Sequence, residues 1–483
     1  MKNTKKLLAL ALVLVMLTAL SATVFAAGTN EITVTGAKNG ETYNIYKMLD
    51  LAVNDATNPT AFTYKLNTKW SAFWTTGAGK DYITTTASGT DTYVEWKSDK
   101  QTADDMEAFG KAAAAWAAAN SIAPDKDAIT VSGGTAKWTG LDNGYYLVTS
   151  TYGTLVSVAS TPTNPVQEVK EKNSDNTTEK EVLEDSSSAY ATQNDAQVGD
   201  TITFRSKVNI VKNSINVVYH DTMTDGLTWT GVDNVGVFTD ADCTTALDAA
   251  NYTVAAGATG TTDTFTVTFT NAYTNSLTAA TTIYIKYTAT LNDNAVVTDP
   301  QTNTPSVKWG NAGNSTGTPT ETYTRKFQIL KYKEGDSGKD PLDGAKFQLY
   351  TAETGGTAMN LAVNAAGTIY RVYADDTKLP TGYTKTTDNK IVTIKNEKIT
   401  VEGVDSDTYW LEETDAPEGF NKIVGRIKVQ VSADNSLIVE IANHAGTVLP
   451  STGGIGTTLF YVIGAVLALG AGVVLVTKRR VRE

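Results

Sequence analysis

Short segments in which apolar and polar residues alternate recur along most of this chain, and no other feature constrains its fold as strongly. Clear examples are residues 201–204, 265–269, 283–287 and 427–431, with clusters of glycine, asparagine and aspartate between segments of this kind. Because successive side chains of a strand point to opposite faces, such alternation predicts half-buried strands joined by short turns. We therefore expect an all-β protein made of antiparallel sandwiches.

One segment departs from this pattern and predicts a helix in the first part of the chain. Residues 104–120 contain an alanine-rich run that is interrupted by Trp116, and alanine is the strongest helix former. Polar or proline-marked stretches at 162–178 and 315–324 predict domain boundaries. A chain of 483 residues has room for about three domains. We expect them at 27–170, 171–323 and 324–446, with the helix inserted in the first.

Composition excludes several classes of function. The formal net charge of −12 argues against nucleic-acid binding, which usually requires a basic face. The chain has a single cysteine, Cys243, so no intramolecular disulfide can join its domains. The only histidines are His220 and His444, and neither lies in a catalytic or metal-binding motif. We expect no enzymatic activity on other molecules, no cofactor and no metal site.

The N-terminus has the composition of a secretory signal peptide. Lysines among the first six residues precede an apolar run at 7–20, and residues 24–26 supply a cleavage site with small residues. The apolar run is too short for a typical membrane anchor. We expect residues 1–26 to be removed during export and the mature chain to begin near Ala27.

The C-terminus carries a second pattern related to export. A pentapeptide at 449–453 is followed by an uncharged apolar stretch at 459–476 and then by a basic tail. The apolar stretch can nearly span a bilayer, and the basic tail would remain cytoplasmic. The pentapeptide consists of Leu449, Pro450, Ser451, Thr452 and Gly453.

In this order, the parts of 447–483 resemble the LPxTG sorting signal of Gram-positive sortase substrates, although the pentapeptide alone would also suit a turn-rich linker. The resemblance implies cleavage between Thr452 and Gly453, with Thr452 held as an acyl-enzyme until an amine captures it. It implies a secreted protein that is covalently attached to the cell wall. The membrane would hold the chain only transiently, through residues 459–476.

Four segments of the last domain resemble a collagen-adhesin B-type (CnaB-type) domain, an immunoglobulin-like sandwich of Gram-positive pilins. They are residues 327–333, 341–347, 409–420 and 437–443. The resemblance implies a self-catalysed isopeptide bond between Lys331 and Asn443. It also implies that Glu413 promotes the formation of this bond.

The alternation of side chains supports these three positions independently. Lys331, Glu413 and Asn443 each continue a row of apolar residues spaced two apart, so each side chain would face a core. Burial favours a neutral lysine amine, which can attack an asparagine carboxamide while a protonated carboxyl group moves protons and ammonia leaves. The alternative is a solvated lysine and carboxylate at the surface, the commonest location of such residues.

The middle domain contains a second set of this kind. Residues 217–227 resemble the pilin middle-domain segment that carries an acidic promoter, and the resemblance implies the set Lys180, Asp221 and Asn311. Each of these residues continues an alternating row, and Asn303 is an alternative acceptor. Ordinary polar residues at strand ends would give the same pattern.

A short segment between the first two domains lies where pilins carry the lysine that links subunits. Within residues 169–173, Lys172 precedes Asn173 as the linking lysine does, and Lys170 is an alternative on the same strand face. A charged edge or linker would look similar. The resemblance implies a bond between Lys172 and Thr452 of the next subunit.

Taken together, the parts resemble an LPxTG-anchored major (shaft) pilin of Gram-positive bacteria. The family implies several partners: a pilin-type sortase, a housekeeping sortase, identical subunits, accessory pilins and peptidoglycan. The prediction is a structural subunit of a cell-surface pilus, or fimbria. The alternative is a wall-anchored monomeric or pilus-tip adhesin that binds a host or surface ligand, for which three domains leave no room for a large additional module.

Overall fold

The computed structural model describes residues 30–54, 59–153, 155–446 and 455–480. The predicted signal peptide at 1–26 therefore lies outside the described residues. The pentapeptide from Leu449 to Gly453, which includes Thr452, also lies outside them.

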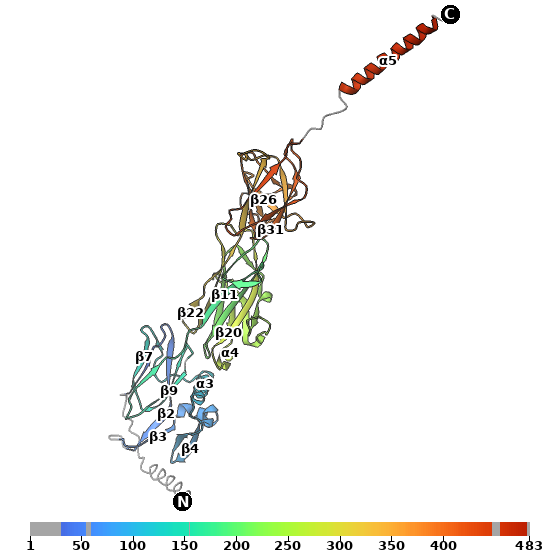
Figure 1. The fold of residues 1–483 in the computed structure, drawn as a ribbon. Coiled ribbons are helices and arrows are strands. Elements are labelled where there is room, and N and C mark those ends of the chain that lie inside the picture. The colour runs from blue at the N-terminus through green and yellow to red at the C-terminus, as the bar shows by residue number, and fades with distance from the viewer. Residues whose placement is uncertain (1–29, 55–58, 154, 447–454, 481–483) are drawn as a thin grey trace. The chain divides into compact units, whose positions relative to one another are not determined.

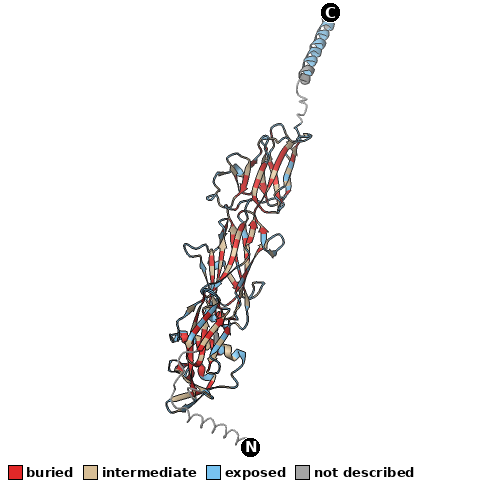
Figure 2. Cartoon of the chain, turned by 90° about the vertical axis from the view of Figure 1, so that its left-hand side faces the viewer, coloured by how far each residue is buried: buried red, intermediate tan, exposed pale blue. Residues whose placement is uncertain are grey.

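Strands are the predominant secondary structure of the described chain, which confirms the predicted all-β class (Figure 1). They belong to two compact units. The first unit runs to Arg325 and includes Gly403–Asp405, and the second comprises Lys326–Glu402 and the chain from Ser406 onward. Buried positions, red in Figure 2, lie mainly at alternate residues of the strands, as half-buried strands require.

The first part of the first unit contains two sheets. A three-stranded sheet has the order β10-β1-β7, and a seven-stranded sheet has the order β4-β5-β3-β2-β8-β9 with β6 paired to β2. Aromatic residues such as Trp70, Phe73 and Phe109 fill one of its cores. The strands are β1 (Asn30–Thr35), β2 (Thr42–Val53), β3 (Phe62–Leu66), β4 (Ile83–Ser88), β5 (Asp91–Trp96), β6 (Ile129–Thr130), β7 (Thr135–Leu141), β8 (Gly144–Ser150), β9 (Leu155–Ser160) and β10 (Val166–Lys170).

Helices cover part of this region: α2 (Ser71–Thr75) and the predicted longer helix, α3 (Ala103–Ala119). A capping box begins α3. The side chain of Thr102 accepts a hydrogen bond from the backbone N–H of Asp105, and the side chain of Asp105 accepts one from the backbone N–H of Thr102. Phe109 and Ala113 on one face of α3 are buried. The predicted range of 104–120 is therefore correct to within one residue at each end.

The middle part of the first unit is a sandwich of two sheets. One sheet has the order β12-β11-β14-β20-β16 with β17 paired to β20, and the other has the order β13-β23-β21-β15-β19-β18 with β22 paired to β21. Phe204 and Tyr287 of the first sheet share a core with Tyr219 and Phe265 of the second. The elements are β11 (Thr177–Glu184), β12 (Ala189–Ala191), β13 (Gln193–Asp195), β14 (Thr201–Ile210), β15 (Val218–Met223), β16 (Leu227–Trp229), β17 (Gly236–Phe238), β18 (Tyr252–Ala256), β19 (Phe265–Phe269), α4 (Asn271–Ser276), β20 (Thr281–Leu291), β21 (Gln301–Trp309), β22 (Gly313–Thr316) and β23 (Thr320–Tyr323).

The second unit also contains two sheets, with the orders β28-β26-β27-β30-β24-β33 and β29-β25-β31-β32. The first and last strands, β24 and β33, are parallel neighbours although they lie at opposite ends of this part of the sequence. The strands are β24 (Arg325–Lys333), β25 (Lys346–Tyr350), β26 (Leu361–Asn364), β27 (Ile369–Val372), β28 (Tyr383–Lys385), β29 (Ile391–Val392), β30 (Ile399–Val404), β31 (Thr408–Asp415), β32 (Arg426–Gln430) and β33 (Ile438–Asn443).

The described chain ends in an apolar helix, α5 (Ile455–Arg480). Its segment Phe460–Lys478 has a mean hydropathy of 2.3 and is long and apolar enough to cross a membrane. No other described helix meets these criteria of length and hydropathy. This segment overlaps the predicted membrane stretch at 459–476.

Candidate functional site

A lysine, a glutamate and an asparagine meet inside the second unit, as the sequence predicts. Lys331 lies on β24, Glu413 on β31 and Asn443 at the end of β33. Nζ of Lys331 donates a hydrogen bond to Oδ1 of Asn443 and lies 2.9 Å from Oε1 of Glu413. Nδ2 of Asn443 donates to the same Oε1 at 3.1 Å. The exposed fractions of the three residues are 1%, 0% and 0%, so the set is buried away from the protein surface.

The strand arrangement explains why these side chains meet. Lys331 is opposite Ile441 in the parallel pair of β24 and β33, so Asn443 lies two residues further along the same face. Glu413 comes from β31 in the other sheet and points inward at a buried position of an alternating strand. The backbone N–H of Ile423 donates to Oε2 of Glu413 at 2.6 Å. This bond orients the carboxyl group and leaves Oε1 for the lysine and the asparagine.

Burial lowers the pKa of the Lys331 amine, and this effect outweighs the opposing hydrogen bond and charge of Glu413. A lowered pKa increases the fraction of neutral amine, which is the nucleophilic form. The ring of Phe347 has its centre 5.5 Å from Nζ and makes the surroundings less polar. The set can therefore hold a neutral amine against a carboxamide, with one carboxyl group in contact with both.

A second set of the same functional groups is buried in the middle part of the first unit. Lys180 on β11 donates to Oδ1 of Asn303 on β21, and its Nζ lies 2.5 Å from Oδ2 of Asp221 on β15. The exposed fractions are 3% for Lys180 and 0% for the other two. Because β15 and β21 belong to the opposite sheet, Lys180 reaches across the sandwich. Burial lowers the pKa of Lys180 to about 8 although Asp221 acts in the opposite direction.

The structure corrects the acceptor that the sequence predicts for this set. It places Asn303 at the lysine, whereas the predicted acceptor Asn311 lies elsewhere. Asn303 and Asn311 are an even number of residues apart, so alternation places both on the buried face of the strand. However, β21 ends at Trp309 and the following Gly310 has a φ of +59°, so the buried row stops before Asn311. Asn311 is exposed, and its Nδ2 donates to Oγ1 of Thr42 at 3.2 Å. Alternation indicates the face of a residue but not the end of its strand.

The turn that contains Asn311 encloses a buried carboxylate, which the sequence does not reveal. The backbone N–H groups of residues 311–313 donate to Glu41 at distances between 2.8 and 3.1 Å. The hydroxyl of Thr151 donates to the same carboxylate at 2.5 Å. Glu41 has no exposed surface. Its hydrogen bonds therefore join the first and middle parts of the first unit.

Two tyrosines surround the carboxyl group of Asp221. The Tyr219 hydroxyl donates to Oδ2 of Asp221 at 2.9 Å, and the Tyr287 hydroxyl donates to the same oxygen. Nδ2 of Asn303 donates to the Tyr287 hydroxyl at 3.2 Å. Burial, reinforced by the charge of Asp221, raises the pKa of both phenols far above the ordinary value. The only sequence signal for these tyrosines is their place in alternating rows, which core tyrosines share.

The two candidate linking lysines, Lys170 and Lys172, are both exposed. Glu171 between them is buried, and its carboxylate accepts hydrogen bonds from the Tyr43 hydroxyl at 2.8 Å and from the backbone N–H groups of Lys172 at 3.1 Å and Asn173 at 3.2 Å. These bonds hold the backbone of the segment in place. Neither lysine ammonium group forms an ion pair with a residue that the structure describes.

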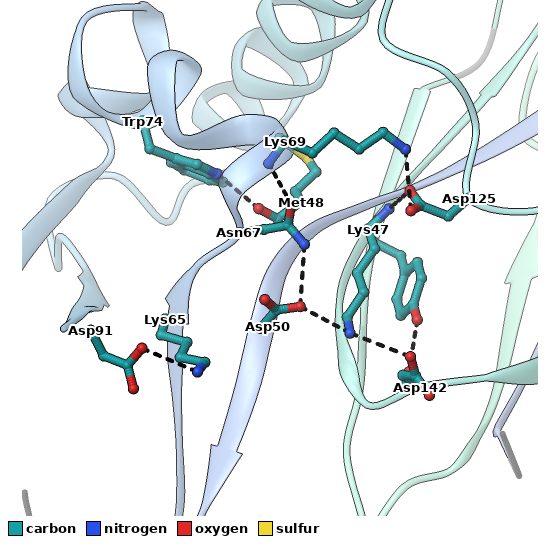
Figure 3. A network of polar contacts seen from close by, with 11 residues as sticks. Lys47, Met48, Asp50, Lys65, Asn67, Lys69, Trp74, Asp91, Asp125 and Asp142 are labelled. Atoms are coloured by element: carbon teal, nitrogen blue, oxygen red, sulfur yellow. Dashed lines mark hydrogen bonds and ion pairs between the residues drawn. The ribbon is translucent and has the colours of Figure 1, made fainter. Parts of the chain in front are cut away.

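A further buried lysine lies on β2 in the first part of the chain, and carboxylates surround it (Figure 3). Nζ of Lys47 is 2.9 Å from Oδ1 of Asp50 and 3.8 Å from Oδ2 of Asp142. Asn67 donates to the same oxygen of Asp50 at 3.2 Å. In Figure 3 the Lys47 side chain extends between the two aspartates. This ion-pair network ties β2 to the loop that precedes β8.

Two family models match the chain. The SpaA prealbumin-like fold domain matches residues 327–445, which contain the set of Lys331, Glu413 and Asn443. The LPXTG cell wall anchor motif matches residues 442–482, which contain the predicted pentapeptide and α5. This match confirms the predicted sorting signal. The protein is therefore anchored to the cell wall and lies at the cell surface.

The comparisons with whole proteins give more distant similarities. No curated protein sequence matches the chain. Among solved structures, the full-length RrgB pilus protein from Streptococcus pneumoniae is 14% identical, with a TM-score of 0.45 over 88% of this chain and 99% of that one. The full-length major pilin SpaD from Corynebacterium diphtheriae is 18% identical, with a TM-score of 0.41 over 86% of this chain and 98% of that one.

Proposed function

We propose that this protein is a sortase-polymerised shaft subunit of a Gram-positive cell-surface pilus. In this proposal each subunit is joined to the next through Thr452 and is stabilised internally by Lys–Asn isopeptide bonds. The wall-anchor motif supports processing by a sortase. The observation that carries the proposal is the pair of buried sets, each with a lysine, an asparagine and a carboxyl group in contact.

The geometry of the second unit supports a simple reaction. Glu413 takes a proton from the Lys331 ammonium group, which gives a neutral amine beside a protonated carboxyl group. Nζ then forms a bond to Cγ of Asn443, the Cγ–Nδ2 bond breaks, and Nδ2 leaves as ammonia. The proton that ammonia needs comes from the attacking nitrogen, by way of Glu413, which contacts both nitrogen atoms. No oxidant or cofactor is required.

Such bonds would provide the durability that a single cysteine cannot. The residues to be joined are 112 positions apart for Lys331 and Asn443, and 123 positions apart for Lys180 and Asn303. In the chain-entropy model, closing loops of this length stabilises a fold by about 5 kcal/mol each. A cross-link between the first and last strands of a domain also prevents tension from separating them. Both properties suit a fibre subunit outside the cell.

The exposed lysines supply the amine that polymerisation needs. A sortase would hold Thr452 as a thioester, and the amine of Lys172 in the next subunit would displace the enzyme to form an amide. Lys172 is our choice for this amine because it precedes Asn173, as the linking lysine of pilins does, and Lys170 is the alternative. Both are exposed on a backbone held by Glu171. Only a neutral amine can attack the thioester, so the sortase must remove a proton from the ammonium group. Repeated head-to-tail joining produces an open filament.

The proposal requires one sortase for assembly of the filament and another for its attachment to the cell wall. A pilin-type sortase would join identical subunits and accessory pilins, and a housekeeping sortase would attach the completed filament to peptidoglycan. A wall-anchored monomeric or pilus-tip adhesin would use the same anchor and the same internal bonds. Polymerisation separates the two functions, because an adhesin of that kind does not need a linking lysine between its first two domains.

The test is the Lys172→Ala variant, produced in a Gram-positive host that carries the pilin-type sortase. We expect the ladder of high-molecular-weight polymers on denaturing gels to disappear while monomer remains attached to the wall. Lys170→Ala is the matched control and should leave the ladder intact. If the two results are exchanged, Lys170 is the linking residue. A ladder that survives the double substitution would contradict the shaft function and favour the adhesin.

A further inference from the structure

The two buried sets differ in how the acid reaches the nitrogen that must leave. In the second unit, Oε1 of Glu413 contacts both Nζ of Lys331 and Nδ2 of Asn443, at 2.9 and 3.1 Å. One carboxyl group can therefore take a proton from the attacking nitrogen and deliver it to the leaving nitrogen. No additional residue is needed for the proton transfer at this site.

In the middle set the acid is an aspartate, whose side chain is one methylene group shorter. Oδ2 of Asp221 accepts from Lys180 and from both tyrosines, and Oδ1 has no hydrogen-bond partner among the described residues. The described hydrogen bonds include none between Asp221 and the carboxamide of Asn303. Instead, Nδ2 of Asn303 donates to the Tyr287 hydroxyl, which itself donates to Asp221. Tyr287 therefore occupies the gap between the acid and the leaving nitrogen.

We propose that Tyr287 is a proton-relay residue of the middle set, which passes a proton from Asp221 to Nδ2 of Asn303. This inference rests on the isopeptide chemistry proposed above. Nζ of neutral Lys180 bonds to Cγ of Asn303, and the Cγ–Nδ2 bond breaks. As it breaks, Tyr287 gives its phenolic proton to Nδ2 and takes one from protonated Asp221, which in turn takes one from Nζ. The products are an amide and ammonia, with Tyr287 and Asp221 restored to their starting forms.

The surroundings of Tyr287 suit this role. Its ring lies between those of Phe204, which is stacked at a centroid distance of 5.7 Å, and Phe265, which is edge-on at 4.8 Å. These contacts fix the position of the hydroxyl. Because burial raises the pKa of the phenol far above its ordinary value, a phenolate does not accumulate. The proton must then pass through the hydroxyl in a single concerted transfer rather than leave it first.

Tyr219 provides a matched control within the same set. Its hydroxyl also donates to Oδ2 of Asp221, and it contacts the hydroxyl of Ser206 at 2.7 Å and the hydroxyl of Tyr287. Tyr219 is as deeply buried as Tyr287. It has no described hydrogen bond to Asn303, so it can orient the acid but cannot reach the leaving nitrogen.

The test measures the rate of each bond separately. The full-length chain is synthesised in a cell-free reaction, samples are stopped with denaturant at intervals, and the cross-linked peptides are quantified by mass spectrometry. Loss of a general acid–base group typically slows a reaction by about 10²-fold or more, and we expect Tyr287→Phe to slow the Lys180–Asn303 bond by such a factor. The Lys331–Asn443 bond should form at its normal rate. Tyr219→Phe should have a much smaller effect on the middle bond.

A rescue variant separates a relay from a purely structural role. Adding Asp221→Glu to Tyr287→Phe lengthens the acid to the side chain that contacts the amide directly in the second unit. We expect this double variant to regain most of the lost rate, and a failure to regain any would contradict the relay. An unchanged rate in Tyr287→Phe would overturn it outright. If the unsubstituted chain forms no Lys180–Asn303 bond, the proposed chemistry of the middle set fails instead.

Discussion

Replacing Glu413 with glutamine removes the acid from the second unit with little change in shape. The glutamine side chain would fill the same volume, and its carbonyl oxygen can still accept from the backbone N–H of Ile423, as Oε2 of Glu413 now does at 2.6 Å. An amide cannot take a proton from the attacking nitrogen or give one to the leaving nitrogen, so the group that moves protons between Lys331 and Asn443 is lost. The bond to Asn443 should not form. The variant chain should therefore retain one ammonia, about 17 Da, that the unsubstituted chain loses.

The length of the loop determines the expected effect on stability. Lys331 and Asn443 are 112 residues apart. The chain-entropy relation for a loop of this length corresponds to about 5 kcal/mol at 25 °C. In a domain of this size, 1 kcal/mol changes Tm by roughly 3–6 °C. The Tm of the second unit should accordingly fall by roughly 15–30 °C in Glu413→Gln.

Intact-mass spectrometry and differential scanning calorimetry on the same preparation test this reasoning. Glu412→Gln is the matched control, because Glu412 is a neighbouring, partly exposed carboxylate that pairs with Arg426 at 3.2 Å. A surface pair of this kind contributes about 0–1 kcal/mol, so the control should keep its mass deficit and nearly its full Tm. A Glu413→Gln chain with the full deficit would refute the role of Glu413. A chain without the bond but with an unchanged Tm would refute the loop argument.

Three further predictions concern the first unit. Glu41→Gln weakens the hydrogen bonds that three backbone N–H groups donate to this side chain. The free energy of unfolding measured in urea should therefore fall by about 1–3 kcal/mol, and an unchanged urea midpoint of unfolding would contradict this. Asn303→Ala should abolish the middle cross-linked peptide whereas Asn311→Ala should preserve it, and the reverse result would reinstate the sequence prediction. The rate at which the Lys180–Asn303 bond forms should fall above about pH 8, because Lys180 then loses the proton that it must pass to Asp221. A rate that rises through pH 8 would contradict this and show that the neutral amine alone limits the reaction.

The resemblance to a CnaB-type domain implies the set in the second unit, and strand alternation supports it because each of its three residues continues an apolar row. Lys331, Glu413 and Asn443 all occupy inward positions. In the middle set alternation does not distinguish Asn311 from its alternative Asn303, because the end of β21 depends on the turn at Gly310 rather than on the hydrophobic period.

Long-range contacts account for what local composition does not predict. The stretch 162–178, predicted as a boundary, contains β10, because parallel pairing with β1 places Lys170 opposite Thr35 and fixes a polar segment as a strand. The hydrogen bonds of Glu41 and Tyr287 likewise come from distant parts of the chain. A buried carboxylate and a core tyrosine have no sequence pattern that distinguishes them from ordinary residues of their strands.

The most direct test of polymerisation is the identity of the residue to which Thr452 is bonded in cell-wall extracts. Digestion of the polymer and mass spectrometry should yield a branched peptide in which the Thr452 carbonyl forms an amide with the Lys172 side chain. The same digest should contain Thr452 attached to peptidoglycan in the smaller amount expected of one wall-proximal subunit per filament. Finding Thr452 attached only to peptidoglycan, with no lysine-branched peptide, would contradict the proposal that this protein forms a pilus shaft.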